Sequence, residues 1–585
     1  MVSIVMGIRF LSSSKRPFPC LTAVLFIFLF TACQGTADVV YPTPILPASV
    51  PLPAATPTGE LAASQPDRPP TPIITPQTAV TLPPLPQPAE PAPAAAAGQG
   101  WRIGAGPDTP GALQAQIAQF AAASNGRFTW VGEAEADVRL GLEGERPFAQ
   151  WTYVVAAPFP TIADEISLGA LQAAWRGEGE TLFVAPDTAA LFTALWGAGA
   201  AQIVPAEALV EQLWAARPAL ALTPFEQLQP ELKALRLDGA NVVAHDFNPA
   251  AYPLTVAIGL DGAETAVADF LAAFPGATAR NYRPDQLTRI AITGVTALVR
   301  ATAYNMEQRG ILWPAEDVGP VLQTADIAHI SNEVAFTPDC PYPNPIGGTT
   351  FCSRDSYFAL LEHLEVDVID LTGNHLNDYG RENLVRTIGM YEAAGMATFG
   401  GGRDAAHAAE PALFEHHGNR IAFVGCNSFG PNFAWATDDG AGARPCDESI
   451  MAQIGELAAA GYLVIATTQE AEYYQYAPTP QQVAISQAMV EAGASIVSGS
   501  QAHHAMGFGF HDGGFIHYGP GNLFFDQMNM LGTRQAFVAT YLVENGRLLH
   551  VDLWTGLIEN YAKPRLMTPQ ERAEALSAVF QASGW

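Results

Sequence analysis

The chain has 585 residues, which is longer than a single hydrophobic core supports, so several domains are expected. It carries 57 acidic and 28 basic side chains, for a formal net charge of −29. That charge argues against nucleic acid or an anionic membrane surface as the main partner.

The N-terminal segment has the features of an export signal. Three basic residues, Arg9, Lys15 and Arg16, precede an apolar run from Cys20 to Phe30, and two small residues then lead to Cys33. This pattern resembles a bacterial lipoprotein signal, in which Cys33 carries lipid and becomes the mature N-terminus. A retained membrane anchor, or ordinary secretion with an incidental Cys33, would fit the same pattern. In each case the bulk of the chain is exported.

Residues 34–100 are dominated by Pro, Ala and Thr, as in the run LPPLPQPAEPAPAAAA. Such a segment cannot bury enough apolar surface to fold, and Pro keeps it extended. We therefore expect a disordered, semi-stiff linker that sets a distance from the membrane.

A first folded domain is expected from 101 to 262. Short apolar runs alternate there with helical stretches, such as 111–123 and 206–216, which is typical of α/β layering. The order of these pieces resembles the periplasmic substrate-binding proteins of the phosphate and molybdate type. A ligand cleft, a contact for a cell-wall polymer and a degenerate scaffold all remain open, and no residue here is assigned to a site.

A second α/β domain is expected from 282 to 560, with polar clusters at the ends of its apolar runs. Asn332-Glu333 ends one run, and the run 366–371 ends in Gly373-Asn374-His375 before a stretch of helical spacing. The carboxyl ends of parallel strands meet at one edge of a sheet, so these clusters are expected to form a shared site. Imidazole is a good neutral ligand and an amide oxygen a hard one, which suits metal or phosphate-type chemistry.

Four cysteines outside the signal predict two disulfides. Cys340 with Cys352, and Cys426 with Cys446, would each close a short irregular loop in an oxidising compartment. The alternative is a four-thiolate zinc site, but the chain lacks the CxxC spacing typical of such sites.

Several motifs of the second domain occur in an order that resembles the bacterial capsule-synthesis protein CapA family, which is associated with poly-γ-glutamate production. They are NE, GNHLNDYG with TFGGGRDAAHAAEP, AEYY with PTPQQ, GSQAHH, and YGPGNLFFDQ. This family resembles the calcineurin-like metallophosphoesterases. The resemblance covers roughly the last half of the chain and implies a two-sheet sandwich flanked by helices, with a divalent-metal site at the strand ends.

Part of the family's ligand set is present in this chain. Glu333 stands at the family's acidic position, and Asn374 and His375 match its Asn-His pair. His503 is the second of the two histidines in the family's last ligand loop, and Glu472 belongs to the retained Glu-Tyr pair. The resemblance thus implies metal ligation by Glu333, Asn374, His375 and His503.

Other family positions have changed. Val295 stands where the family usually has Asp, and Gln469 and Gln501 replace two histidines. A two-metal site needs a bridging carboxylate and several imidazoles, and Gln is a weak neutral donor. The remaining set could hold one divalent ion (Mn, Fe or Zn) or none.

Three functions therefore compete. One is an exported hydrolase or transferase with one metal, in which His375 or His503 assists proton transfer. Another is a catalytically silent relative that binds a capsule polymer, such as poly-γ-glutamate, through the same groove. Gln469, Glu472, Gln501 and Asn522 would then contact the polymer. The third is an envelope scaffold without a ligand.

The expected organisation is a membrane-anchored lipoprotein with two α/β domains. Its segments are the signal peptide (1–33), the linker (34–100), the substrate-binding-protein-like domain (101–262), the metallophosphoesterase-like domain (282–560) and a C-terminal helical tail (561–585).

Overall fold

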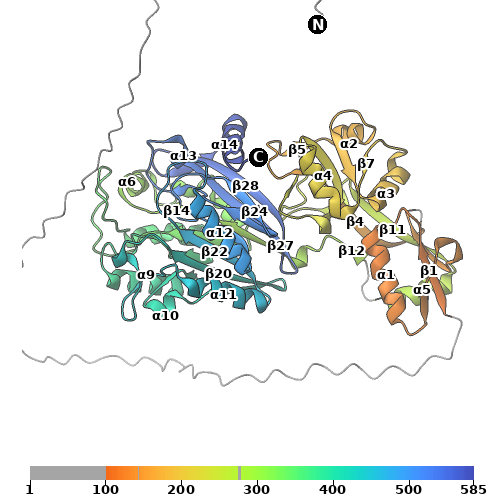
Figure 1. Cartoon of the computed structure of the whole chain (residues 1–585), viewed down its shortest axis with the longest axis horizontal. Coiled ribbons are helices and arrows are strands. Elements are labelled where there is room, and N and C mark those ends of the chain that lie inside the picture. The colour runs from red at the N-terminus through yellow and green to blue at the C-terminus, as the bar shows by residue number, and fades with distance from the viewer. Residues whose placement is uncertain (1–99, 143, 275–278) are drawn as a thin grey trace, which may run out of the picture. The chain divides into compact units, whose positions relative to one another are not determined.

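The computed structural model describes residues 100–142, 144–274 and 279–585 (Figure 1). The expected lipoprotein signal, Cys33 and the linker up to residue 99 lie outside these ranges. The described residues form a mixed α/β protein with several sheets. Among them, no helix combines the length and the apolar character needed to cross a membrane.

A ten-stranded sheet organises the described residues up to Arg280, in the order β2-β1-β3-β11-β4-β8-β6-β7. Its longest strand, β4 (Arg146–Pro158), also pairs with β9 and β12 and is buried from Trp151 onward. The apolar run TYVVAAP suits this place because a strand covered on both faces needs no outward polar residue. The other strands are β1 (Trp101–Ala105), β2 (Phe128–Trp130), β3 (Val138–Gly141), β6 (Thr181–Val184), β7 (Gln202–Ile203), β8 (Ala219–Pro224), β9 (Leu232–Ala234), β11 (Thr255–Gly262) and β12 (Ala279–Arg280).

The helices of this region agree closely with the sequence pattern. The stretch 111–123 is helix α1 (Gly111–Ala123), and 206–216 holds a short 3-10 turn followed by α4 (Leu209–Ala215). The remaining elements are α2 (Leu168–Trp175), α3 (Pro186–Trp196), α5 (Glu264–Ala273) and a small parallel pair, β5 (Glu165–Ile166) and β10 (Arg236–Leu237). Because α5 and β12 come after Gly262, the sheet continues beyond that residue.

Two further large sheets follow in the chain. One has nine strands in the order β17-β16-β15-β13-β27-β28-β29, with β14 pairing β15 and β26. Its strands are β13 (Leu287–Ile292), β14 (Val295–Thr296), β15 (Ile327–Asn332), β16 (Val368–Asp370), β17 (Ala397–Phe399), β26 (Asn522–Phe524), β27 (Gln535–Glu544), β28 (Arg547–Glu559) and β29 (Lys563–Leu566). The other has the order β19-β20-β22-β23-β25-β24. Its strands are β19 (Ala412–His416), β20 (Asn419–Asn427), β22 (Leu463–Gln469), β23 (Ala494–Ser498), β24 (Phe508–His511) and β25 (Gly514–His517).

Buried side chains connect these sheets to each other and to helices. One cluster combines residues of both sheets, among them Ile292 and Phe423. A second packs the nine-stranded sheet against α8 (Phe358–His363) and α9 (Arg381–Ala393). A third packs the six-stranded sheet against α11 (Glu448–Ala459) and α12 (Pro480–Ala492). Figure 1 labels α11 and α12 in this region, where α11 contacts β20 and β22, and α12 contacts β23. The other helices of this part of the chain are α6 (Arg300–Arg309), α7 (Gly319–Gln323), α10 (Ala405–Ala408), α13 (Leu531–Arg534) and α14 (Pro569–Ala582). Two short strands, β18 (Gly401–Gly402) and β21 (Gly442–Ala443), form a separate antiparallel pair.

The last part of the chain holds more sheet than the expected helical tail implies. β29 pairs antiparallel with β28, so the nine-stranded sheet extends beyond residue 560, and the helix α14 begins only at Pro569. Thr568 caps α14 together with Glu571, which reaches back to the Thr568 backbone in a capping box.

Candidate metal-binding site

Polar side chains singled out from the sequence lie at strand ends of the two C-terminal sheets. They are Glu333 after β15, Asn374 and His375 after β16, Gln469 at the end of β22, Gln501 and His503 after β23, and Asn522 at the start of β26. β15 and β16 are adjacent and parallel, and a further parallel bridge pairs Val334 with His375. This pairing brings Glu333 and His375 to the same edge of the sheet.

Glu333 is a fully buried acid. The residue is 0% exposed, and within the described ranges neither of its Oε atoms has a hydrogen-bond partner. A Cβ at Gly373 would lie 2.8 Å from the Cα of Glu333 and 3.0 Å from its Cγ, so only glycine leaves room there. An ionised carboxylate without a partner costs several kcal/mol to bury. This position is therefore suited to contact with a cation.

The imidazole of His503 is held in one tautomer by Asn522. Nδ2 of Asn522 donates to the Thr533 carbonyl at 2.9 Å, which leaves Oδ1 of Asn522 facing Nδ1 of His503 at 2.8 Å. Because that oxygen can only accept, Nδ1 of His503 carries a proton. The unprotonated nitrogen of the neutral ring is then Nε2.

Nε2 of His503 faces two carboxylates. It lies 3.8 Å from Oε1 of Glu333 and 3.7 Å from Oε1 of Glu472, distances too long for hydrogen bonds. Oδ1 of Asn374 is also buried without a partner in the described chain. A neutral imidazole nitrogen, a carboxylate and an amide oxygen are accepted ligands of divalent metals. The residues present thus fit a single divalent ion.

His375 differs from these candidate metal ligands because its ring holds a proton beside Asp378. Its Nδ1 lies 2.7 Å from Oδ2 of Asp378, which also accepts the backbone N–H of Phe351 at 2.8 Å. Burial lowers the pKa of His375, but the hydrogen bond to Asp378 and the negative charges of Glu333 and Glu472 outweigh burial and raise this pKa above its usual value. His375 therefore keeps its proton to higher pH than a free imidazole.

The two replacement glutamines lie in different surroundings. Gln469 is 1% exposed, and its Oε1 accepts from Nδ2 of Asn427 at 2.9 Å. Gln501 is 3% exposed, and both its amide atoms lack a partner within the described residues. Val295 is fully buried on β14 and offers no ligand atom. Both polar atoms of the Asn522 amide are engaged, Oδ1 by His503 and Nδ2 by Thr533. Asn522 therefore positions the imidazole of His503.

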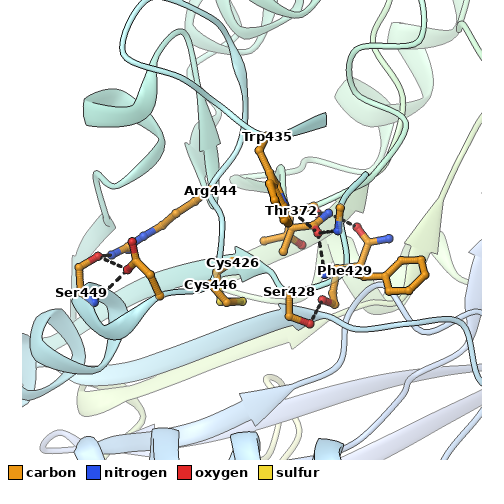
Figure 2. Close-up of a disulfide and its surroundings, with 12 residues drawn as sticks. Thr372, Cys426, Ser428, Phe429, Trp435, Arg444, Cys446 and Ser449 are labelled. Atoms are coloured by element: carbon orange, nitrogen blue, oxygen red, sulfur yellow. Dashed lines mark hydrogen bonds between the residues drawn. A yellow bond between two sulfur atoms is a disulfide. The ribbon is translucent and has the colours of Figure 1, made fainter. Parts of the chain in front are cut away.

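Both predicted disulfides are present, Cys340–Cys352 and Cys426–Cys446. Figure 2 shows the Cys426–Cys446 disulfide beside the segment that runs from Trp435 to Arg444. The N–H of Asn427 donates to the Arg444 carbonyl at 2.7 Å, and Nε1 of Trp435 donates to Oδ1 of Asn427 at 3.2 Å. The Cys426–Cys446 disulfide therefore holds the segment 435–444 in place, and this segment orients Asn427 and, through Asn427, Gln469.

Sequence reasoning did not single out Asn427. It is fully buried as the last residue of β20, and its Nδ2 also donates to the Thr372 carbonyl at 2.9 Å. The signal was available, because Asn427 ends the apolar run RIAFVGCN in the same way that Gln469 ends the next strand.

A second acid–imidazole group lies away from the strand ends. Across the described ranges, one group of three such residues has its ligand atoms within 4.8 Å of one another: Glu491, His511 and Asp512. His511 belongs to the β24–β25 hairpin and Glu491 to α12. No sequence pattern predicted this group.

The fold and these contacts define an α/β protein with a buried acid–imidazole site at its strand ends. Residues 289–527 match the family described as bacterial capsule synthesis protein PGA_cap. The match of residues 289–527 to that family is what the motif order implied.

Two relatives are similar over this region. The capsule biosynthesis protein CapA of Bacillus anthracis is 29% identical over 274 residues, covering 45% of this chain and 66% of the relative. The PGA biosynthesis protein CapA of Bacillus subtilis is 24% identical over 270 residues, covering 46% of this chain and 70% of the relative. The chain thus spans about two thirds of the length of each.

Solved structures give weaker similarities. A 5'-nucleotidase precursor from Thermus thermophilus has a TM-score of 0.27 at 14% identity, over 50% of this chain and 58% of that one. An ABC-type phosphate transport receptor from Vibrio cholerae has a TM-score of 0.25 at 13% identity, over 30% and 92%. Scores this low do not establish a shared fold.

Proposed function

We propose that this protein takes part in making or handling an acidic capsule polymer, poly-γ-glutamate or a close analogue, through a site that holds one divalent metal. The match of residues 289–527 to the capsule synthesis family supports a role in handling such a polymer. The observation that supports a metal is the buried carboxylate of Glu333, which has no hydrogen-bond partner among the described residues and faces Nε2 of His503.

The finer architecture that we propose is a two-sheet sandwich of the metallophosphoesterase type. In its support, one buried cluster combines side chains of both C-terminal sheets, while separate clusters pack their other faces against helices. The preceding ten-stranded sheet is proposed to form a domain of its own, with the substrate-binding-protein resemblance as a hypothesis for its ancestry.

In the proposed reaction, Glu333, Asn374 and His503 hold the metal. The ion, Mn, Fe or Zn, would supply Lewis-acid activation of a water or of a substrate oxygen. Asn522 keeps Nε2 of His503 directed at the site by holding Nδ1. His375, whose proton is retained through Asp378, donates that proton to a leaving group, so hydrolysis or group transfer of the polymer is the reaction class.

A second candidate is polymer binding without catalysis. The observation that favours it is the buried amide of Gln501, whose two polar atoms lack partners in the described residues and could contact a peptide-like chain. In that case Gln469 and Glu472 would line the same groove. A scaffold without a ligand is the least favoured reading, because it does not explain unpartnered polar groups at the strand ends.

The proposed location is the extracytoplasmic face of the cell membrane. The basic and apolar N-terminal segment and Cys33 support a lipid anchor, and the Pro- and Ala-rich linker supports a tether. The two disulfides are consistent with an oxidising compartment.

Metal content tests this proposal most directly. The full chain, purified in detergent, is analysed by inductively coupled plasma mass spectrometry beside a His375→Ala, His503→Ala double variant. The matched control is His511→Ala, which removes an imidazole from the surface group. Near-stoichiometric metal in the wild type and in the control, but not in the double variant, is expected. Equal metal in all three, or none in any, would refute the metal site.

His375 has its own test within the hydrolase reading. His375→Ala is expected to abolish turnover of a polymer substrate, because the group that donates a proton is gone. Unchanged turnover in this variant would remove His375 from the mechanism.

A further inference from the structure

A cleft of about 220 Å³ lies beside the strand-end site, between the N-terminus of α6 and the loop closed by the Cys340–Cys352 disulfide. Its walls include three tyrosines, Tyr342, Tyr357 and Tyr379, and one phenylalanine, Phe351. The volume suits one amino-acid-sized unit better than a large ligand.

The charge of this cleft differs from that of the molecule. The chain has 57 acidic and 28 basic side chains, yet the described residues that line the cleft include Arg300 and Arg354 and no Asp or Glu. Each guanidinium is also paired with one carboxylate outside the lining, Arg300 with Asp526 and Arg354 with Glu307, so the lining offers an anion N–H donors in place of a net positive charge. The cleft is therefore complementary to an acidic group.

Arg354 has the geometry of an anion-binding side chain. Its Nη1 donates to Oε1 of Glu307 at 2.5 Å, and the hydroxyl of Tyr357 donates to the same oxygen at 2.9 Å. Nε and Nη2 of Arg354 make no hydrogen bond within the described residues, and the side chain is 39% exposed. Glu307 thus holds the guanidinium in place on one side and leaves the other nitrogens for a ligand.

Arg300 is more firmly built into the wall. Its Nε and Nη2 pair with Asp526, and its guanidinium lies 4.8 Å from the ring centre of Phe351 and 4.9 Å from that of Phe525. The same two rings reach the strand-end site, because Phe351 lies 4.4 Å from the His375 ring and Phe525 stacks 5.0 Å from the His503 ring. The cleft and the candidate metal site thus share one wall.

We propose that this cleft is a subsite for one carboxylate-bearing unit of an acidic polymer, bound through the guanidinium of Arg354. The inference rests on the proposed function, because a unit held here would place the neighbouring bond of the same chain near His375 and His503. A planar guanidinium matches a carboxylate through two parallel hydrogen bonds, which gives both affinity and orientation.

Calorimetric titration of the full chain with hexa-γ-glutamate tests the subsite, and hexa-γ-glutamine serves as the neutral oligomer. The test variant is Arg354→Gln. A second variant, Arg354→Lys, keeps the positive charge but lacks the two parallel N–H donors of the guanidinium. The matched control is Arg403→Gln, which removes a similarly exposed arginine that is paired with Glu392 and does not line the cleft. Metal content is measured in every sample.

We expect Arg354→Gln to weaken hexa-γ-glutamate binding about tenfold, the usual worth of one charge-assisted contact. The affinity of Arg354→Lys should lie between those of Arg354→Gln and the wild type, and Arg403→Gln should bind like the wild type. The metal content should be the same in all samples. Unchanged affinity in Arg354→Gln, or an equal loss in Arg403→Gln, overturns the subsite alone. Wild-type protein that binds neither oligomer overturns the polymer role as well. Displacement of the oligomer by millimolar inorganic phosphate overturns the carboxylate assignment.

Discussion

Two acid–imidazole groups in this protein differ in what surrounds them. At the strand ends, the side chains of Glu333 and His503 are 1% and 4% exposed, and their nearest carboxylate and imidazole atoms lie 3.8 Å apart. On the β24–β25 hairpin, Glu491 and His511 are 60% and 25% exposed and lie 2.9 Å apart. The hairpin pair is the closer one, yet the strand-end pair is the stronger candidate for function.

The difference follows from solvation. An exposed acid and imidazole are hydrated whether or not they meet, so their contact contributes little and needs no functional explanation. A buried carboxylate that forms no hydrogen bond destabilises the fold, and such a group persists where a ligand compensates for it. Unsatisfied burial, more than proximity, therefore favours the strand-end group as the candidate site.

The largest effect is expected for Glu333→Gln, which keeps the shape of the side chain and removes its charge. Affinity for Mn²⁺ or Zn²⁺ should fall by more than about 100-fold, since changes to groups outside the ligand set already cost 10–100-fold. The metal-free variant should also gain about 1 kcal/mol or more in stability, because an unpaired buried charge is gone. Metal titration and thermal unfolding in chelator measure the two effects.

Glu491→Gln is the control for that experiment, since it makes the same chemical change in the exposed group. It should alter neither metal affinity nor stability measurably. A metal-free Glu333→Gln protein less stable than the wild type would show that Glu333 is a structural acid.

Asn522→Leu should give the next largest effect. It removes the acceptor that keeps the proton of His503 on Nδ1, so Nε2 is no longer always the free nitrogen. Loss of such an outer partner typically costs about 10–100-fold in metal affinity. Isothermal titration with the metal measures it, and an affinity within twofold of the wild type would show that the tautomer of His503 is set by something else.

The sequence predicted the strand-end residues well because the cause is local. A buried parallel strand must end where its apolar run ends, so Glu333 and the Asn374-His375 pair could be placed at strand ends from the pattern alone. The two disulfides were also predictable, since parity and short loops left few pairings.

Contacts set by loop packing could not be predicted in this way. Asn522 reaches His503 across 19 residues, and Arg300 meets Phe525 only because loops from distant parts of the chain converge. The β27–β28 hairpin is different, because its turn, Asn545-Gly546, has the positive φ values of a tight hairpin and is a known sequence signal.

His517 extends the comparison to a buried imidazole without an acid. It is 1% exposed and stacks on Phe508, and burial lowers its pKa from 6.5 to about 3. The unfolded chain therefore binds a proton that the folded chain does not, so stability falls as pH drops below 6.5 towards 3. The slope from one such group is at most about 1.4 kcal/mol per pH unit.

His517→Phe should remove this contribution, and unfolding in urea at pH 6.5 and 5.5 should show a stability loss smaller by about 1 kcal/mol than in the wild type. His550 provides the internal reference, because burial also lowers its pKa, to about 4, and it remains in the variant. An identical pH dependence in both proteins would mean that His517 is protonated in the folded state.

The smallest effect is expected for His511→Ala. Its imidazole contacts Glu491 at 2.9 Å on the surface, where water replaces the lost contact, so stability should change by less than about 0.5 kcal/mol. The number of metal ions per chain should also stay the same, although Glu491, His511 and Asp512 lie within 4.8 Å of one another. One ion fewer per chain in His511→Ala would reverse the comparison, because proximity of ligand atoms at an exposed hairpin would then outweigh unsatisfied burial at the strand ends. Mass spectrometry of the native protein, with Glu333→Gln alongside, assigns each ion to one of the two groups.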